Sequence, residues 1–185
     1  MKLNSLISSL SGNQFAIKKG LEEDGGILIL LPHELNISEN RIHNVGRIDV
    51  KNKLLGLALN LNKYNRSLRT ATAEFRENIE NLKVPPVDLN NMQKGQMLEK
   101  AKSQFKNHLS EIKTFGTRLM NDIEDVLVDV RFYIKKDKSI ISPAILQRRV
   151  RKEELERWRE KDRPELRKEI ESVREKVEKE GRNSA

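Results

Sequence analysis

The chain has 185 residues, of which 36% are hydrophobic, 35% charged and only 4% aromatic, and its net charge at pH 7 is +8. It contains no cysteine, which excludes a disulfide framework and cysteine-based metal sites and nucleophiles. No apolar run approaches the ~20 residues that a membrane-spanning helix requires. High charge with few aromatic side chains is typical of long helices, in which a narrow apolar stripe is enough for packing.

Residues 1–50 form the first of three predicted segments, an N-terminal element with both α and β structure. Apolar residues recur at helical spacing near its start, which predicts a short amphipathic helix there rather than a signal peptide. The polar residues 11–14 indicate a turn. Residues 15–20 and 27–32 then predict the two strands of a short β-hairpin, or at least an extended element. A lone two-stranded hairpin is marginally stable in water, so it needs a cover.

The second of these strands carries an apolar run between a Gly-Gly pair and a proline. Its residues are Ile27, Leu28, Ile29, Leu30 and Leu31. A strand that is apolar on both sides is normally buried on both faces. We therefore predict that another subunit or a protein partner covers this run. In the alternative, the first helix and the start of the following hairpin cover it within one chain.

Residues 51–138 form the second segment, a long antiparallel helical hairpin with coiled-coil-like packing. Apolar residues repeat every three or four positions in two stretches, 54–82 and 98–133, which are separated by two consecutive prolines. The second helix is predicted to be roughly 70 Å long at ~1.5 Å per residue, and one of its ends extends beyond its partner. Asn65 lies beside the first stripe, where we expect it to be exposed rather than buried as a register-fixing residue.

Residues 139–185 form the third segment, a charged helical C-terminal part. Ser142 followed by Pro143 predicts a helix start, with the serine as N-cap and the proline at the first helical position. Pro164 predicts an interruption, with Asp162 as the N-cap of a fresh helix. The apolar face of the earlier helix is sparse. It consists of Leu146, Val150, Leu155 and Trp158.

The chain shows no motif that supports catalysis or the binding of a cofactor or metal. Its three histidines, His33, His43 and His108, do not stand at metal-site spacing with one another or with acidic residues. A glycine-rich phosphate loop and a nucleophile elbow are both missing. We therefore predict a protein that is not an enzyme and has no cofactor.

Positive charge is concentrated between residues 131 and 152, which hold eight basic side chains and one acidic side chain. Such density favours contact with a polyanion, because each phosphate that is neutralised releases counterions. The alternative is that these side chains solvate helix faces or contact a protein partner. The candidate polyanion-binding residues are Arg131, Lys135, Lys136, Lys138, Arg148, Arg149, Arg151 and Lys152.

These patterns favour a non-enzymatic structural or assembly protein that acts through helix–helix contacts in an oligomer or a larger complex. The alternative is a basic nucleic-acid-binding subunit of a nucleoprotein complex that uses residues 131–152. A third class is a membrane-active helical protein in which residues 27–31 insert into the lipid boundary. A protein partner or a second copy is the expected partner, nucleic acid is the alternative, and a membrane is the least favoured. The cytoplasm is the expected compartment.

Overall fold

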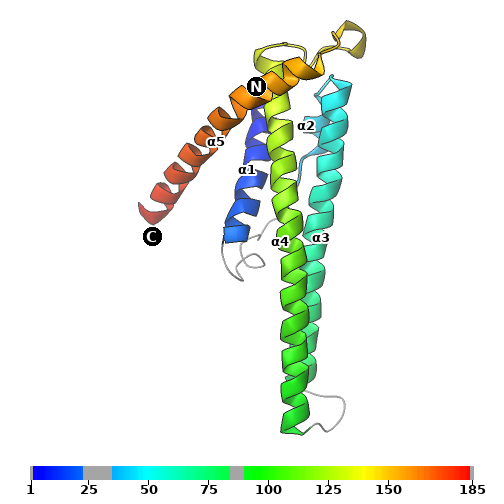
Figure 1. Cartoon of the computed structure of the whole chain (residues 1–185), viewed down its shortest axis with the longest axis vertical. Helices are drawn as coiled ribbons and strands as arrows, with labels where there is room; N and C mark the ends of the chain where they lie inside the picture. Colours follow the sequence, from blue (N-terminus) through cyan, green and yellow to red (C-terminus); the bar gives the residue numbers. More distant parts are fainter. Residues whose placement is uncertain (1, 23–34, 84–89, 184–185) are drawn as a thin grey trace.

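The computed structural model describes residues 2–22, 35–83 and 90–183, and the secondary structure in these ranges is helical, without a strand (Figure 1). In chain order the elements are α1 (Lys2–Glu22), α2 (Glu39–His43), α3 (Ile48–Lys83), α4 (Asn91–Lys135), the short 3-10 helix η2 (Ala144–Leu146) and α5 (Lys152–Asn183). The prediction of a mainly α-helical protein is confirmed. In Figure 1, α3 and α4 form the long axis, and the other helices gather around its upper half.

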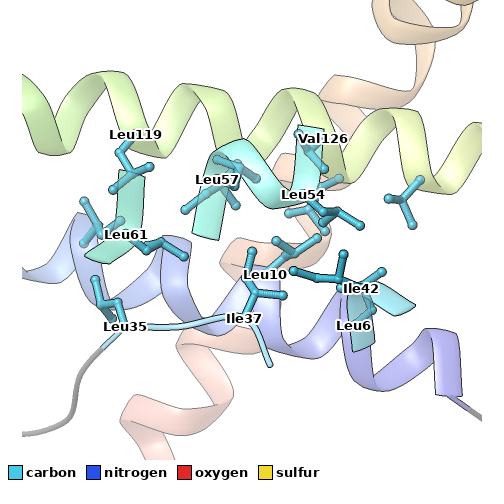
Figure 2. Packing of buried hydrophobic residues seen from close by; sticks show 14 of the residues in the cluster. Leu6, Leu10, Leu35, Ile37, Ile42, Leu54, Leu57, Leu61, Leu119 and Val126 are labelled. Atoms are coloured by element: carbon cyan, nitrogen blue, oxygen red, sulfur yellow. The ribbon is translucent and has the colours of Figure 1, made fainter. Parts of the chain in front are cut away.

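α3 and α4 form the predicted antiparallel hairpin (Figure 1). The α3 stripe is buried as far as Ala71, with Leu54 and Leu61 fully enclosed, and beyond that residue it is only partly buried. α4 contributes Leu119 and Ile123, which are also fully enclosed. Figure 2 shows Leu54 and Leu61 between α4 on one side and α1 on the other. The apolar periodicity therefore identifies the helix pair and also the face that each helix buries.

α1 is one continuous helix, so the predicted turn at residues 11–14 and the first predicted strand at 15–20 are wrong. Leu6, Leu10 and Ile17 are fully buried and Asn13 nearly so, and their spacing of three to four residues continues one helical face through the expected turn. Glycine at position 12 only weakens a helix, and this tertiary packing outweighs that effect. The second predicted strand, 27–32, lies outside the described residues.

An extended segment at residues 35–38 crosses between α1 and α3 and is fixed there by two asparagine side chains. The Asn65 Nδ2 donates to the Leu35 carbonyl at 2.8 Å, and the Leu35 N–H donates to Asn65 Oδ1 at 3.2 Å. Asn13 Nδ2 donates to the Asn36 carbonyl at 2.9 Å. Asn65 is therefore buried, and the expectation that it is exposed is wrong. The Asn65 amide forms hydrogen bonds with both the N–H and the carbonyl of Leu35, which have no partner strand to bind among the described residues.

α5 begins at Lys152, nine residues after Pro143, the first helical position that the sequence predicts. Ser142 lies instead in a turn, its N–H donating to the Ser139 carbonyl at 3.1 Å, and only η2 follows before α5. Pro164 lies inside α5, so the predicted interruption is also wrong. The Asp162 carboxylate is not a cap, because it binds Arg131 of α4. This contact between helices outweighs the one backbone hydrogen bond that the proline removes.

Ion pairs dominate the contact between α4 and α5. Asp129 of α4 is almost fully buried and accepts two hydrogen bonds from Arg159 at 2.8 Å, and it also binds Lys53 of α3. Glu124 accepts from Arg163 and Arg167. The apolar share of the contact includes Trp158, whose ring lies edge-to-face with that of Phe132, and Leu166, which is buried.

Candidate interaction surfaces: the loop between α4 and α5, and the tip of the hairpin

The α4–α5 loop, residues 136–151, lies at the end of the molecule that is opposite to the tip of the hairpin (Figure 1). α4 ends with the N–H groups of Lys136 and Asp137 both donating to the Phe132 carbonyl, at 2.8 and 3.0 Å. Lys138 follows with a φ of 55°, in the left-handed region. A lysine in this conformation is strained by roughly 1 kcal/mol, so the neighbouring contacts must hold the chain there.

Arg47, between α2 and α3, supplies most of those contacts. Its guanidinium donates to Ser139 Oγ at 3.0 Å, to Asp137 at 3.4 Å and to the Arg148 carbonyl at 3.2 Å. The same group lies 4.1 Å from the centre of the Tyr133 ring, and the side chain is only 6% exposed. One buried cation therefore ties both halves of the loop to the end of α4.

Gly46 provides the second anchor, through close contact with the loop backbone. Its N–H donates to the Ile140 carbonyl at 3.0 Å. A Cβ at this position would lie 2.7 Å from the carbonyl oxygens of both Ile141 and Ser142, so no other residue fits without displacing the loop. The Gln147 side chain closes the contact by donating to the carbonyls of Gly46 and Ser142 at 3.0 and 2.6 Å.

Three aliphatic side chains of this fixed loop point away from the protein. Ile141 is 64%, Leu146 74% and Ile145 91% exposed, whereas Ile140 beside them is buried. The prediction that Leu146 lies on the apolar face of a long helix is wrong, because α5 begins only after the loop. Isolated aliphatic residues on a surface are common, but three within six positions form an exposed apolar patch, a feature that is typical of interaction sites.

Arg131 is the one candidate polyanion-binding residue that the structure removes from the surface. It donates to both carboxylate oxygens of Asp162, at 2.7 and 3.1 Å, and to both of Glu169, at 2.6 and 3.1 Å. The hydrogen bond to Glu169 raises the pKa of Arg131 above its usual value, and the same bond lowers the pKa of Glu169. Arg131 thus holds α5 in place and is not free for an external anion.

Arg148 is also engaged, although it is exposed. It binds the buried Asp137 and donates to both oxygens of Glu154 at 2.7 and 3.0 Å. The hydrogen bond to Glu154 has the largest effect in raising the pKa of Arg148, and the bond to Asp137 adds to it. The bond from Arg148 to Glu154 also lowers the pKa of Glu154. Lys152 lies 3.7 Å from Glu156 in an exposed pair, which is a weak constraint.

The remaining candidates are exposed and form no ion pair with a described residue. They are Lys135, Lys136, Lys138, Arg149 and Arg151. The loop's one acidic residue, Asp137, has a side chain only 1% exposed and is bound by Arg47 and Arg148. The outward face of the loop therefore carries positive charge together with aliphatic side chains, and no carboxylate of its own.

The tip of the hairpin is the second candidate surface, and we call it the arm (residues 72–83 and 91–111). Here α3 and α4 run side by side without a third helix in the described residues (Figure 1). Ala101 is the only buried residue of the arm. The rings of Phe75 and Phe105 stack across the pair with centroids 4.3 Å apart, yet both stay partly exposed. They line a groove of about 620 Å³ with polar and charged neighbours.

The structure adds two findings on chemistry. Within the described ranges no group of three or more His, Asp or Glu side chains is arranged to hold a metal ion. No helix in those ranges has both the length and the apolar character to cross a membrane. The predicted partner-contact run, residues 27–31, lies outside the part of the chain that the structure describes. Comparison with protein families, characterised proteins and solved structures finds no match to this chain.

Proposed function

We propose that the protein is a non-enzymatic assembly protein that uses the arm to contact another helical chain, most simply a second copy of itself. The observation that supports this proposal is the poor burial of the arm. Only Ala101 is buried there, whereas the upper half of the hairpin buries an almost continuous stripe.

Energetics explain why such an arm needs a partner. Helices in water gain most of their stability from tertiary packing of an apolar face, and short helices are marginal without it. The partly exposed apolar residues of the arm offer that face. They are Phe75, Ile79, Leu82, Leu98, Phe105 and Leu109. A partner helix that covers this stripe would complete a small helical bundle of the usual kind.

Light scattering on a size-exclusion column tests this proposal. We expect a mass above that of one chain, and a shift toward the monomer when Phe75→Ala and Phe105→Ala are combined. The control is Leu59→Ala, which removes an aliphatic side chain that is 70% exposed on α3. Trp158 fluorescence should stay unchanged in both variants, because Trp158 lies on α5. A wild-type chain that stays monomeric at every concentration, or an arm variant that still assembles, would contradict the proposal.

Nucleic-acid binding is the second candidate function, supported by the five exposed cations near the α4–α5 loop. It is weakened because Arg131 and Arg148 already have carboxylate partners. The salt dependence of duplex binding measures it. Each cation that contacts a phosphate should add about one unit to the slope of log K against log salt.

A further inference from the structure

We infer that the α4–α5 loop is a binding site for an anionic lipid surface, which the aliphatic side chains enter while the flanking cations meet the headgroups. This inference goes beyond the proposed function, because it concerns the opposite end of the molecule from the arm (Figure 1). It requires no membrane-spanning helix, since a small apolar patch can rest in the boundary between headgroups and acyl chains.

The first support is the position of the aliphatic side chains. Ile141, Ile145 and Leu146 are all more than half exposed, within a loop that protrudes beyond the ends of the helices in Figure 1. Each side chain that leaves water for an apolar phase contributes a favourable free energy in proportion to its area. A convex tip has ready access to a flat bilayer, and no surface hollow has to match its shape.

The second support is charge complementarity. Lys136, Lys138, Arg149 and Arg151 are exposed around the aliphatic residues, and the loop's single carboxylate is buried under Arg47 and Arg148. Each Lys or Arg near an anionic bilayer is favourable, and the attraction falls off within a Debye length. The outward face therefore presents apolar side chains and cations, the two features that favour binding to an anionic membrane surface.

A surface hollow at the base of the loop adds to this charge. It measures about 710 Å³, and Lys136 and Arg151 from the loop line it together with Arg157 and Lys161 of α5. Glu153 and Glu154 also line it, but Glu154 is paired with Arg148. Phosphate groups of lipid headgroups would meet four basic side chains here.

The third support is the rigidity of the loop. Gly46 and Arg47 precede α3 at the same end of the α3–α4 pair and fix the backbone of the loop, so the aliphatic side chains are displayed without a change in fold. A surface that is ordered before binding loses less conformational entropy when it binds. Nucleic acid would reward the cations of the loop equally, but its phosphates offer nothing to three aliphatic side chains.

Vesicle co-sedimentation tests the inference with the whole 185-residue chain. We expect binding to vesicles of phosphatidylcholine mixed with phosphatidylglycerol, weak binding to phosphatidylcholine alone, and a loss of binding as salt rises. Ile145→Ser combined with Leu146→Ser should reduce the partition coefficient by on the order of tenfold for each side chain. The matched control, Leu59→Ser, removes a leucine that is 70% exposed on α3 and should bind like the wild type.

The cations need their own matched pair of variants. Lys138, Arg149 and Arg151 are changed to glutamine in one, and the exposed residues Arg66, Lys106 and Arg118 in the other. Both variants lose three positive charges, so a general effect of net charge would weaken both equally. We expect only the loop variant to lose vesicle binding. Circular dichroism checks that every variant keeps the wild-type helicity.

Three results would overturn the inference. One is a wild-type protein that does not sediment with the anionic vesicles. Another is binding that the loop variants and their controls lose to the same extent, and the last is duplex DNA binding that depends on the loop cations with no vesicle binding.

A fluorescent label tests the same inference by a second method. Because the chain has no cysteine, Ile145→Cys and Leu59→Cys can each carry an environment-sensitive fluorophore. Only the label at position 145 should report an apolar environment when anionic vesicles are added.

Discussion

α4 packs against α3 on one side and against α5 on another, and the two contacts use different side chains. Leu119 and Ile123 of α4 are fully enclosed in the apolar core that it shares with α3 and α1. Toward α5 it presents Glu124, Asp129 and Arg131, all buried and all paired with charged groups. The same helix thus forms an apolar contact and an ionic contact a few residues apart.

The difference separates stability from orientation. Burial of aliphatic side chains is favourable without a particular geometry, so the α3–α4 contact supplies most of the folding free energy. A buried ion pair loses its hydration, and its net contribution is small, but an unpaired member is strongly unfavourable. We therefore expect the ion pairs to fix where α5 lies on α4, and α5 to be the part that acid or salt releases first.

The largest expected effect is that of Leu61→Asp in the α3–α4 contact. Leu61 is fully buried, so the variant loses its apolar burial and encloses an unpaired carboxylate. We expect a loss of roughly 5 kcal/mol or more in the free energy of unfolding, measured by urea denaturation. The control is Leu59→Asp, two residues away and largely exposed, which should change stability by no more than about 0.5 kcal/mol. Equal melting of the two variants would refute the hairpin packing.

The next effect is that of Arg131→Met in the α4–α5 contact. The variant leaves the buried Asp162 without its partner, so we expect a loss of about 3–5 kcal/mol in the attachment of α5. Trp158, the one tryptophan of the chain, should report this release in denaturation before circular dichroism reports unfolding of the hairpin. Adding Asp162→Leu should restore most of the loss, because no buried charge then remains. If α5 is attached as weakly in the double variant as in the single one, the unpaired Asp162 is not the cause of the lost stability.

A smaller effect is expected from acid. Arg131 lowers the pKa of Glu169, so this carboxylate stabilises the folded chain fully above the usual glutamate pKa of about 4.3, and the stabilisation is lost as pH falls through the lowered value. The Glu169 side chain is 58% exposed, which limits its contribution to about 1 kcal/mol or less. During acid titration Trp158 fluorescence should change at a higher pH than helicity. If the fluorescence and the helicity change at the same pH, the α4–α5 contact is not released by acid before the α3–α4 contact, and the prediction is wrong.

The smallest effect is expected for Tyr64→Phe in the apolar contact. The Tyr64 hydroxyl is buried without a hydrogen-bond partner among the described residues, so its removal should change stability by no more than about 0.5 kcal/mol at neutral pH. Tyr133→Phe should lower the free energy of unfolding by about 1 kcal/mol more than Tyr64→Phe does, because the Tyr133 hydroxyl donates a hydrogen bond to Asp49 at 3.0 Å. Urea denaturation of the two variants measures this difference.

The two tyrosines also make the pH dependence testable in base. Burial raises the pKa of both Tyr64 and Tyr133 to about 12, and for Tyr133 the nearby Asp49 adds to the effect. Their neutral forms therefore stabilise the fold fully below pH ~10, and this contribution is lost as pH rises from ~10 toward 12. Because these are the only tyrosines in the chain, absorbance titration should show no phenolate near pH 10. A normal titration near pH 10 would show that neither ring is enclosed.

The helical hairpin was predictable because a repeated stripe constrains a helix on its own. Residues such as Leu54, Leu61 and Leu119 each add to one periodic pattern over many turns, so no single side chain decides the prediction. The continuous α1 was missed because the pattern there includes Asn13, a polar residue that is buried only because Asn36 needs its hydrogen bond. A sequence pattern records side-chain polarity, and it cannot record which distant backbone group a side chain satisfies.

The candidate surface at the α4–α5 loop was predictable only in part. Charge density located the basic segment, but it could not distinguish Arg131, which is consumed by Asp162 and Glu169, from Arg149, which is exposed. That distinction depends on where α5 docks. The aliphatic patch was missed for a similar reason, because Ile145 and Leu146 suit a buried helix face as well as a surface. The role of Arg47 as the anchor of the loop has no local signal, since its partners in the loop lie far along the chain and its one nearby partner, Asp49, is outside the loop.

That distance has a kinetic consequence. Arg47 reaches Ser139 across 92 residues and the Arg148 carbonyl across 101, whereas hairpin contacts near the arm join residues much closer in sequence. Contacts of long sequence separation require the closure of a large loop, so they tend to form after local ones. During folding the α3–α4 pair can zip from its turn upward, and the Arg47 contacts become available only when it is complete. The α4–α5 loop is therefore expected to mature last, so that a nascent or truncated chain would not display the outward-facing Ile145 and Leu146 in their final arrangement.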